Sequence, residues 1–156
     1  MRRAPHPSNR GFTLTEMLIA MLIVAILGAI AIPSFNDSIR KGRRSDAMTA
    51  IAAVQQAQER WRGSRPAYSS SLTELGFSSS SPSGYYTLTL GGLGGAGDEY
   101  GNGYIVTATA NTGTSQAADT DCARMSVRMQ GGTLAYAGGS ADGALNYTET
   151  HACFAR

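Results

Sequence analysis

Hydrophobic residues gather in one long segment near the start of the chain. Residues 17–32 form a run of sixteen positions without a charged or strongly polar side chain, inside a wider apolar stretch of 24 residues, 12–35. As a helix this stretch is about 36 Å long, which is enough to cross a bilayer. Arg2, Arg3 and Arg10 precede it. The positive charge predicts a cytoplasmic amino end, with the rest of the chain carried across the membrane.

A second hydrophobic pattern follows, with the spacing of an amphipathic helix. The apolar positions recur every three or four residues and so share one face: Ala47, Ala50, Ile51, Val54, Ala57 and Trp61. The opposite face carries Arg44, Asp46, Gln55, Gln58, Glu59 and Arg62. We expect one helix over residues 12–62, ending near Gly63. Such a helix is roughly 75 Å long, so its first half must be buried in a membrane or in other copies of the chain.

Two residues predict a weak point within this helix. Pro33 has no N–H and breaks one backbone hydrogen bond, and Gly28 costs about 1 kcal/mol relative to Ala in a helix interior. We therefore expect a bend or local melting over residues 28–33.

Four segments after the helix have the composition of strands. They cover residues 85–90, 104–110, 122–129 and 133–137, and the first two show the clearest alternation of β-forming residues. Short Gly-rich connections between consecutive strands predict an antiparallel meander. The amphipathic half of the helix is expected to pack on this sheet, which makes the predicted fold class α+β.

Charge is unevenly distributed, although the formal net charge is only +2. Residues 36–65 carry a balance of +4 and residues 66–156 a balance of −4. The cluster RKGRR at residues 40–44 suits lipid headgroups or DNA phosphates. We favour the simpler interpretation, a solvated neck. Within the acidic part, Arg124 and Arg128 form a local patch and are the candidates for nucleic-acid contact.

The sequence holds little that catalysis requires. Charged residues make up 15% of a Gly-rich chain, which excludes a coiled coil, a collagen and a large multidomain enzyme. Residues 92–97 fit G-x-G-x-x-G, but the sequence that follows predicts a loop instead of the helix that a nucleotide site needs. Acidic residues such as Asp98 and Glu99 also lie in predicted loops. We expect no enzymatic activity, no cofactor and no metal site.

The amino-terminal segment allows two interpretations. An ordinary secretory signal would be cut after Ala31, behind the small-x-small site at residues 29–31. Glu16 argues against that, because a carboxylate in a hydrophobic run costs about 2.5–3.5 kcal/mol and such a signal has no use for it. The helical pattern also continues past Pro33, so a cut at Ala31 would sever one element.

The run Gly11-Phe12-Thr13-Leu14-Thr15-Glu16 resembles the class III signal of type IV prepilins and pseudopilins. The resemblance implies that a prepilin peptidase cuts between Gly11 and Phe12 on the cytoplasmic side and methylates the new amino end at Phe12. Glu16 is then the acidic residue five positions into the mature chain. Gly28 and Pro33 fall where the helices of this family carry a glycine and a proline kink.

Glu16 needs a counter-charge if it is buried. The free amine that cleavage creates at Phe12 on a neighbouring subunit is a suitable partner when helices stack in a filament. The alternative is a carboxylate that reaches the membrane surface. We favour the partner.

Cys122 and Cys153 are the two cysteines of the chain. They are either free thiols in a reducing compartment or, behind an export signal, a disulfide, which we favour. In the pilin family that we infer, such a bond would attach the C-terminal tail to the sheet and enclose the D-region loop. A disulfide that closes a loop of this length stabilises the folded state by roughly 3–4 kcal/mol.

The sequence from residue 65 to residue 90 is similar to the pilin subgroup that contains minor pilins of the PilE and ComP kind. The resemblance implies a type IV pilus subunit, most consistent with a minor pilin, that supports pilus biogenesis and pilus-linked adhesion or motility. The alternatives are a DNA-uptake receptor, a type II secretion pseudopilin and a major pilin.

The expected organisation follows. Residues 1–11 form the cleaved leader, 12–35 the transmembrane and assembly helix, 36–63 its amphipathic half, and 64–156 a periplasmic β-domain. We expect a single-pass protein of the inner membrane that later joins a surface pilus. Its implied partners are other pilin subunits, the prepilin peptidase, the inner-membrane assembly platform, the membrane and, in the alternative, DNA.

Overall fold

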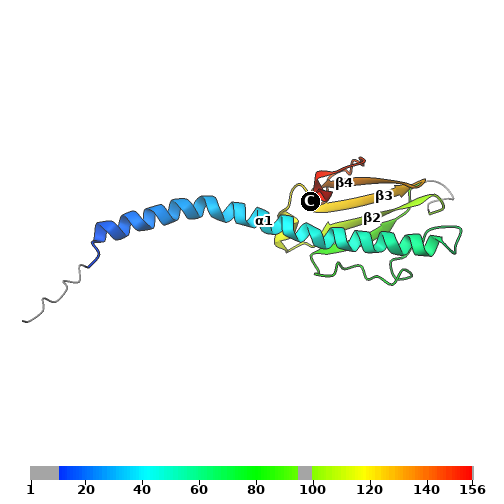
Figure 1. Ribbon diagram of the computed structural model, residues 1–156, viewed down its shortest axis with the longest axis horizontal. Coiled ribbons are helices and arrows are strands. Elements are labelled where there is room, and N and C mark those ends of the chain that lie inside the picture. Colours follow the sequence, from blue (N-terminus) through cyan, green and yellow to red (C-terminus); the bar gives the residue numbers. More distant parts are fainter. Residues whose placement is uncertain (1–10, 95–99, 156) are drawn as a thin grey trace, which may run out of the picture. The chain divides into compact units, whose positions relative to one another are not determined.

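The computed structural model describes residues 11–94 and 100–155, so the predicted leader up to residue 10 lies outside the described part. The chain divides into two compact units, residues 1–37 and 38–156. The elements follow in this order: α1 (Leu14–Arg62), β1 (Tyr86–Gly91), β2 (Gly103–Ala110), the 3₁₀ helix η1 (Ser115–Ala118), β3 (Arg124–Gln130), β4 (Thr133–Gly139) and the 3₁₀ helix η2 (Ala152–Phe154). Helix α1 contributes residues to both units (Figure 1).

The second unit contains a four-stranded antiparallel sheet in the order β1-β2-β3-β4. Strands β3 and β4 are joined by Gly131 and Gly132, whose φ angles of 56° and 84° suit the tight turn of a hairpin. The α+β prediction is therefore confirmed, and each predicted strand lies within two residues of an observed one. The predicted start of the third strand at Cys122 was wrong, because β3 begins at Arg124.

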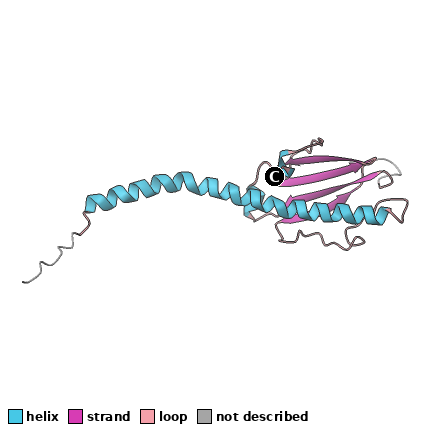
Figure 2. Cartoon of the chain, viewed as in Figure 1, coloured by secondary structure: helices cyan, strands magenta, loops and turns pink. Residues whose placement is uncertain are grey.

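The core of the second unit lies between α1 and one face of the sheet (Figure 2). The helix supplies the apolar stripe that the sequence predicts, with Ala47, Ile51 and Val54 at most 1% exposed. Strands β2 and β3 supply Val106 and Val127, which are completely buried. Burying a Val or Ile side chain contributes about 1.5–3 kcal/mol, so this stripe holds the second half of α1 against the sheet.

Two residues assigned to the polar face of the helix in fact point inward. Asp46 accepts hydrogen bonds from the Ser81 hydroxyl at 2.5 Å and the Ser83 amide at 2.9 Å. Gln58 is completely buried and pairs with the backbone of Ser69, donating at 2.9 Å and accepting at 2.9 Å. Both side chains satisfy the backbone of the loop between α1 and β1, which fixes that loop to the helix.

Candidate functional site

The first unit exposes its hydrophobic side chains. The fourteen exposed large hydrophobic residues in the described part of the chain all lie between Phe12 and Phe35, with exposed fractions from 50% to 77%. Helix α1 is the one described helix that is long and apolar enough to cross a membrane. An apolar surface of this extent marks a site for a membrane or for other protein.

The start of α1 has a defined geometry. Gly11 and Phe12 precede the helix, and the Thr13 hydroxyl accepts a hydrogen bond from the Glu16 amide at 3.2 Å. Thr13 is thus the N-cap, a position that favours Ser, Thr, Asp and Asn. The Glu16 side chain is exposed. A β-carbon built on Gly11 would touch nothing, so the fold itself does not require glycine there.

Gly28 and Pro33 both lie inside α1, which is helical throughout residues 28–33. We expected either a bend or local melting at this point. Local melting is not present. A β-carbon on Gly28 would also meet open space.

The arginines of the 40–44 cluster bind the loop between β2 and β3, which contains η1. Arg40 donates to the Ser115 carbonyl at 3.2 Å, and Arg43 donates to the Ser115 hydroxyl and lies 4.5 Å from the centre of the Tyr85 ring. Arg44 forms a bidentate pair with Asp119, with both N–O distances at 2.7 Å. The interpretation of these arginines as a solvated neck was wrong, because they connect the helix to a loop about seventy residues away.

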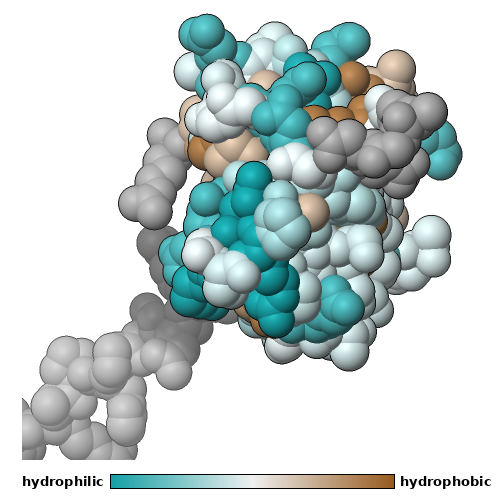
Figure 3. Space-filling view, turned by 90° about the vertical axis from the view of Figure 1, so that its right-hand side faces the viewer, coloured by the Kyte–Doolittle hydropathy of each residue, from teal (hydrophilic) through white to brown (hydrophobic). Residues whose placement is uncertain are grey.

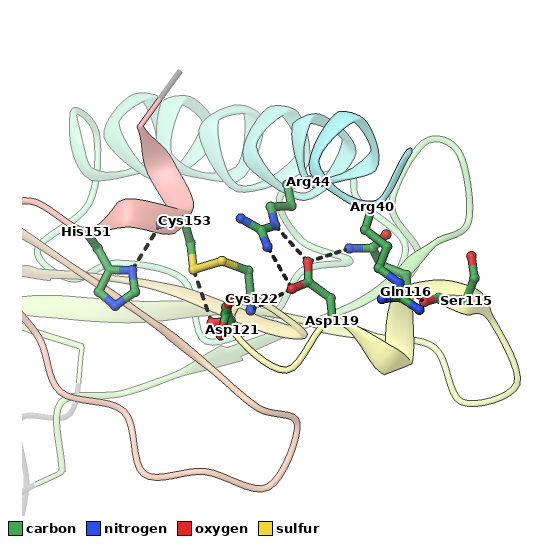
Figure 4. Close-up of polar contacts among 9 residues, drawn as sticks. All are labelled: Arg40, Arg44, Ser115, Gln116, Asp119, Asp121, Cys122, His151 and Cys153. Carbon is green, nitrogen blue, oxygen red and sulfur yellow. Dashed lines mark hydrogen bonds and ion pairs between the residues drawn. A yellow bond between two sulfur atoms is a disulfide. The ribbon is translucent and has the colours of Figure 1, made fainter. Parts of the chain in front are cut away.

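Asp119 is the centre of this contact (Figure 4). It is 4% exposed and also accepts hydrogen bonds from the Gln116 side chain at 3.1 Å and the Cys122 amide at 3.2 Å. Burial by itself would raise the pKa of Asp119, but hydrogen bonds and charge from Arg44, with the Cys122 amide, bring that pKa below its usual value. The carboxylate is therefore held ionised and joins α1 to the segment that carries the first cysteine.

A disulfide joins Cys122 to Cys153, and both residues are at most 2% exposed. It attaches η2 and the C-terminal tail beside β4. His151 caps η2 by accepting a hydrogen bond from the Cys153 amide at 3.2 Å. Gly138 on β4 makes room for this arrangement, since a β-carbon there would stand 2.5 Å from the Cys153 sulfur. The enclosed segment includes β3, β4 and the loop over residues 140–151.

Arg124 and Arg128, the predicted nucleic-acid contacts, both lie on β3 and both contact this C-terminal loop. Arg124 donates to the carbonyls of Ala141 at 3.1 Å and Gly143 at 2.8 Å. Arg128 stacks on Tyr147 at 4.7 Å from the ring centre. Their first role in the structure is to hold the loop against the sheet.

A second group of arginines gathers where α1 ends, and the sequence analysis did not single it out. Arg65 lies 3.5 Å from the centre of the Trp61 ring, and Arg62 lies 5.6 Å from that of Tyr68. Figure 3 looks onto this end of the second unit, where hydrophilic side chains form a band across the face. We call Arg60, Trp61, Arg62, Arg65 and Tyr68 the helix-end cluster. The pattern in the sequence that could have predicted this cluster is the close spacing of basic and aromatic residues around Gly63.

A half-open cavity of about 580 Å³ lies beside α1 and the C-terminal tail. Its lining combines Met48, Tyr136 and Phe154 with Glu149 and His151. The described part of the chain contains no group of three or more His, Cys, Asp or Glu residues that could hold a metal ion. Residues 95–97 of the 92–97 glycine motif, together with Asp98 and Glu99, lie outside the described residues.

Comparison with known families decides what this architecture is. A family model described as type IV minor pilin ComP, DNA uptake sequence receptor, matches residues 33–126, which is more than half of the chain. The chain belongs to the ComP family of type IV minor pilins. A second model, the prokaryotic N-terminal methylation motif, matches residues 6–32 of this pilin. That match covers Gly11, Phe12 and Glu16, so the resemblance noted in the sequence is confirmed.

Individual relatives of this pilin are fimbrial proteins. The type IV major pilin protein PilA of Myxococcus xanthus is 40% identical over 72 residues, which is 46% of this chain and 33% of the relative. Fimbrial protein EcpC of Eikenella corrodens is 24% identical over 139 residues, or 89% of this chain and 80% of the relative. The match thus spans only a third of PilA but most of EcpC. No solved structure matches this pilin.

Proposed function

We propose that this pilin is a minor subunit of a type IV pilus, held in the inner membrane by residues 12–35 and then assembled through the same segment. The observation that carries the proposal is the apolar surface of the first unit, where the fourteen large hydrophobic side chains between Phe12 and Phe35 are exposed. Each such side chain gains about 1.5–3 kcal/mol on burial. Before assembly the membrane buries these side chains, and after assembly other pilin subunits bury them.

Processing by a prepilin peptidase precedes assembly in this proposal. The peptidase removes residues 1–11 by cutting between Gly11 and Phe12, and Phe12 is then methylated. Because the fold leaves open space at Gly11, the requirement for glycine comes from the peptidase. Three features support this proposal: the methylation-motif match over residues 6–32, the non-helical Gly11–Phe12 segment, and the helix that starts at Leu14.

Deletion of the gene tests the proposed function. We expect fewer or no surface filaments in the deletion strain, restoration by the wild-type gene, and the subunit in sheared filaments at low abundance relative to the major pilin. An abundant subunit would indicate a major pilin. Unchanged surface filaments, with a loss of protein secretion instead, would favour the type II secretion alternative.

A second candidate function is DNA reception. The matching family is described as a DNA uptake sequence receptor, and the helix-end cluster offers the chemistry for it. Arginines bind phosphates, and aromatic rings next to arginines stack on bases. Arg60 and Arg65 are exposed, whereas Arg124 is occupied by backbone carbonyls. We therefore place DNA contact at the helix-end cluster in preference to Arg124 and Arg128.

Binding of labelled duplex DNA by the detergent-solubilised protein tests this second function. We expect Arg62→Ala together with Arg65→Ala to weaken binding and to reduce the dependence on salt by about one unit of slope per lost phosphate contact. Arg62 and Arg65 are also substituted singly, and Lys41→Ala is the matched control for each single variant because it too removes one positive charge. Equal losses from Lys41→Ala and from the single arginine variants would mean that only net charge matters.

A further inference from the structure

We propose that Thr13 is a positioning residue for leader cleavage: its hydroxyl caps α1 and so keeps the Gly11–Phe12 peptide bond outside the helix. The inference rests on the proposed processing at Gly11. It assigns a role to a side chain that is neither part of the bond to be cut nor the acidic residue Glu16.

The geometry of the cap is complete at Thr13. Its hydroxyl oxygen lies 3.2 Å from the Glu16 amide nitrogen, and its carbonyl oxygen accepts the hydrogen bond of the Met17 amide at 3.2 Å. Helix α1 begins at the next residue, Leu14. A capping side chain that accepts from the third helical N–H is the usual way to end a helix at its amino side.

The cap matters because it competes with extension of the helix. If the helix began one residue earlier, the Phe12 carbonyl would take the Glu16 N–H that the Thr13 hydroxyl now holds. If the helix began two residues earlier, the Gly11 carbonyl would accept a hydrogen bond from the Thr15 N–H, following the i to i−4 pattern. That carbonyl belongs to the bond to be cut. Near a membrane such extension is favoured, because unsatisfied backbone groups are costly in lipid.

Cleavage needs the same carbonyl to be accessible. Water adds to the Gly11 carbonyl carbon and the bond to the Phe12 nitrogen breaks, which leaves a carboxylate on Gly11 and an amine on Phe12. The peptidase must polarise the Gly11 carbonyl oxygen for this step, and extension of the helix over Gly11 would hold this peptide in a helical turn that hinders access to it. In the structure Gly11 and Phe12 are both exposed and non-helical.

Four variants of the full-length precursor, incubated in membrane vesicles with prepilin peptidase, test the inference. Thr13→Val keeps the shape of the side chain but removes the acceptor. Thr13→Ser and Thr13→Asn both retain capping ability. Thr15→Val is the matched control, because it removes a hydroxyl that lies 3.3 Å from the Thr13 hydroxyl but does not accept from the Glu16 amide. The initial rate of mature protein formation is measured by mass spectrometry.

We expect Thr13→Val to slow cleavage about fivefold, in line with the loss of a typical cap, while the Ser, Asn and Thr15→Val variants stay within about twofold of the wild type. Amide hydrogen exchange at Glu16 in detergent micelles should change in the Val variant alone. Equal cleavage of the wild type and Thr13→Val would overturn the inference. So would rescue by Ser but not by Asn, since the peptidase would then be reading the hydroxyl itself. A wild-type precursor left uncut at Gly11 refutes the proposed processing, and this inference with it.

Discussion

At the scale of single residues, the pair of Arg44 and Asp119 shows how one charge organises distant segments. The two side chains are 15% and 4% exposed, so the pair is largely shielded from water. A buried carboxylate is tolerated only because Arg44, Gln116 and the Cys122 amide all donate to it. Removal of any one of these donors leaves part of the buried Asp119 carboxylate without a hydrogen-bond partner.

We predict that Asp119→Asn lowers the free energy of unfolding by about 2–3 kcal/mol at pH 7, because Arg44 loses a charged partner. The pKa of Asp119 is lowered by folding, so its contribution to stability is present above the unfolded pKa of about 3.9 and is lost as the pH falls through the folded pKa. The difference between variant and wild type should therefore shrink below about pH 4. Denaturant unfolding at several pH values measures it, with the exposed Asp142 as the control in Asp142→Asn. A difference that is constant with pH would contradict the assignment.

Gly11 gives a second prediction at this scale. Gly11→Val should accumulate as full-length precursor, since a side chain before the cut obstructs the peptidase while the fold leaves it free space. Immunoblotting and N-terminal sequencing of the membrane fraction provide the measurement. Mature protein that begins at Ile32 would instead indicate an ordinary signal peptide.

At the scale of elements, the C-terminal tail depends on few attachments. Helix η2 spans only Ala152–Phe154, which is too short to be stable alone. The disulfide, the His151 cap and the close packing at Gly138 hold it beside β4. Backbone bonds between Tyr136 and Thr148, at 2.7 and 2.9 Å, attach the preceding loop to β4.

We predict that Cys122→Ser or Cys153→Ser reduces stability by about 2–4 kcal/mol without affecting membrane insertion. The exported wild type should migrate differently before and after reduction, and the Cys122→Ser variant should not. Thermal unfolding of the purified proteins measures the stability change. Labelling of both cysteines as free thiols in the native exported protein would contradict the prediction.

At the scale of the whole molecule, the two units have different requirements. The second unit has its own core of helix and sheet. In the first unit, by contrast, the large apolar side chains between Phe12 and Phe35 are exposed. The side chains of the first unit can therefore be buried only by a membrane or by other protein chains. In the proposed function, Glu16 needs a positively charged partner in that environment.

We predict that Glu16→Ala and Glu16→Gln are processed and inserted normally but are depleted from sheared filaments at least severalfold. Removal of the charge makes insertion easier, but it leaves the Phe12 amine of a neighbouring subunit buried without a partner, which costs about 3–5 kcal/mol. Quantitative immunoblots of membrane and sheared fractions give the measurement, and Thr15→Val serves as the matched polar control. Incorporation equal to the wild type would show that the carboxylate has no role in assembly.

The sequence alone determined the features that depend on neighbouring positions. The apolar run and the helical stripe at Ala47, Ile51 and Val54 are local patterns, and the structure places both in α1. The class III motif is also a local pattern, and the family match over residues 6–32 supports it. Strand positions followed from alternation within a few residues. These predictions succeed because hydrophobic periodicity is a property of one element at a time.

Only the tertiary structure decided where the polar side chains act. Asp46 and Gln58 fit the outer face of the helix by periodicity, yet both point inward to satisfy a loop. Arg44 finds Asp119 some 75 residues away, and Arg62 and Arg65 meet aromatic rings where α1 ends. Polar groups are buried only where partners compensate them. Those partners come from segments that the chain brings together by folding, so no pattern within one element reveals them.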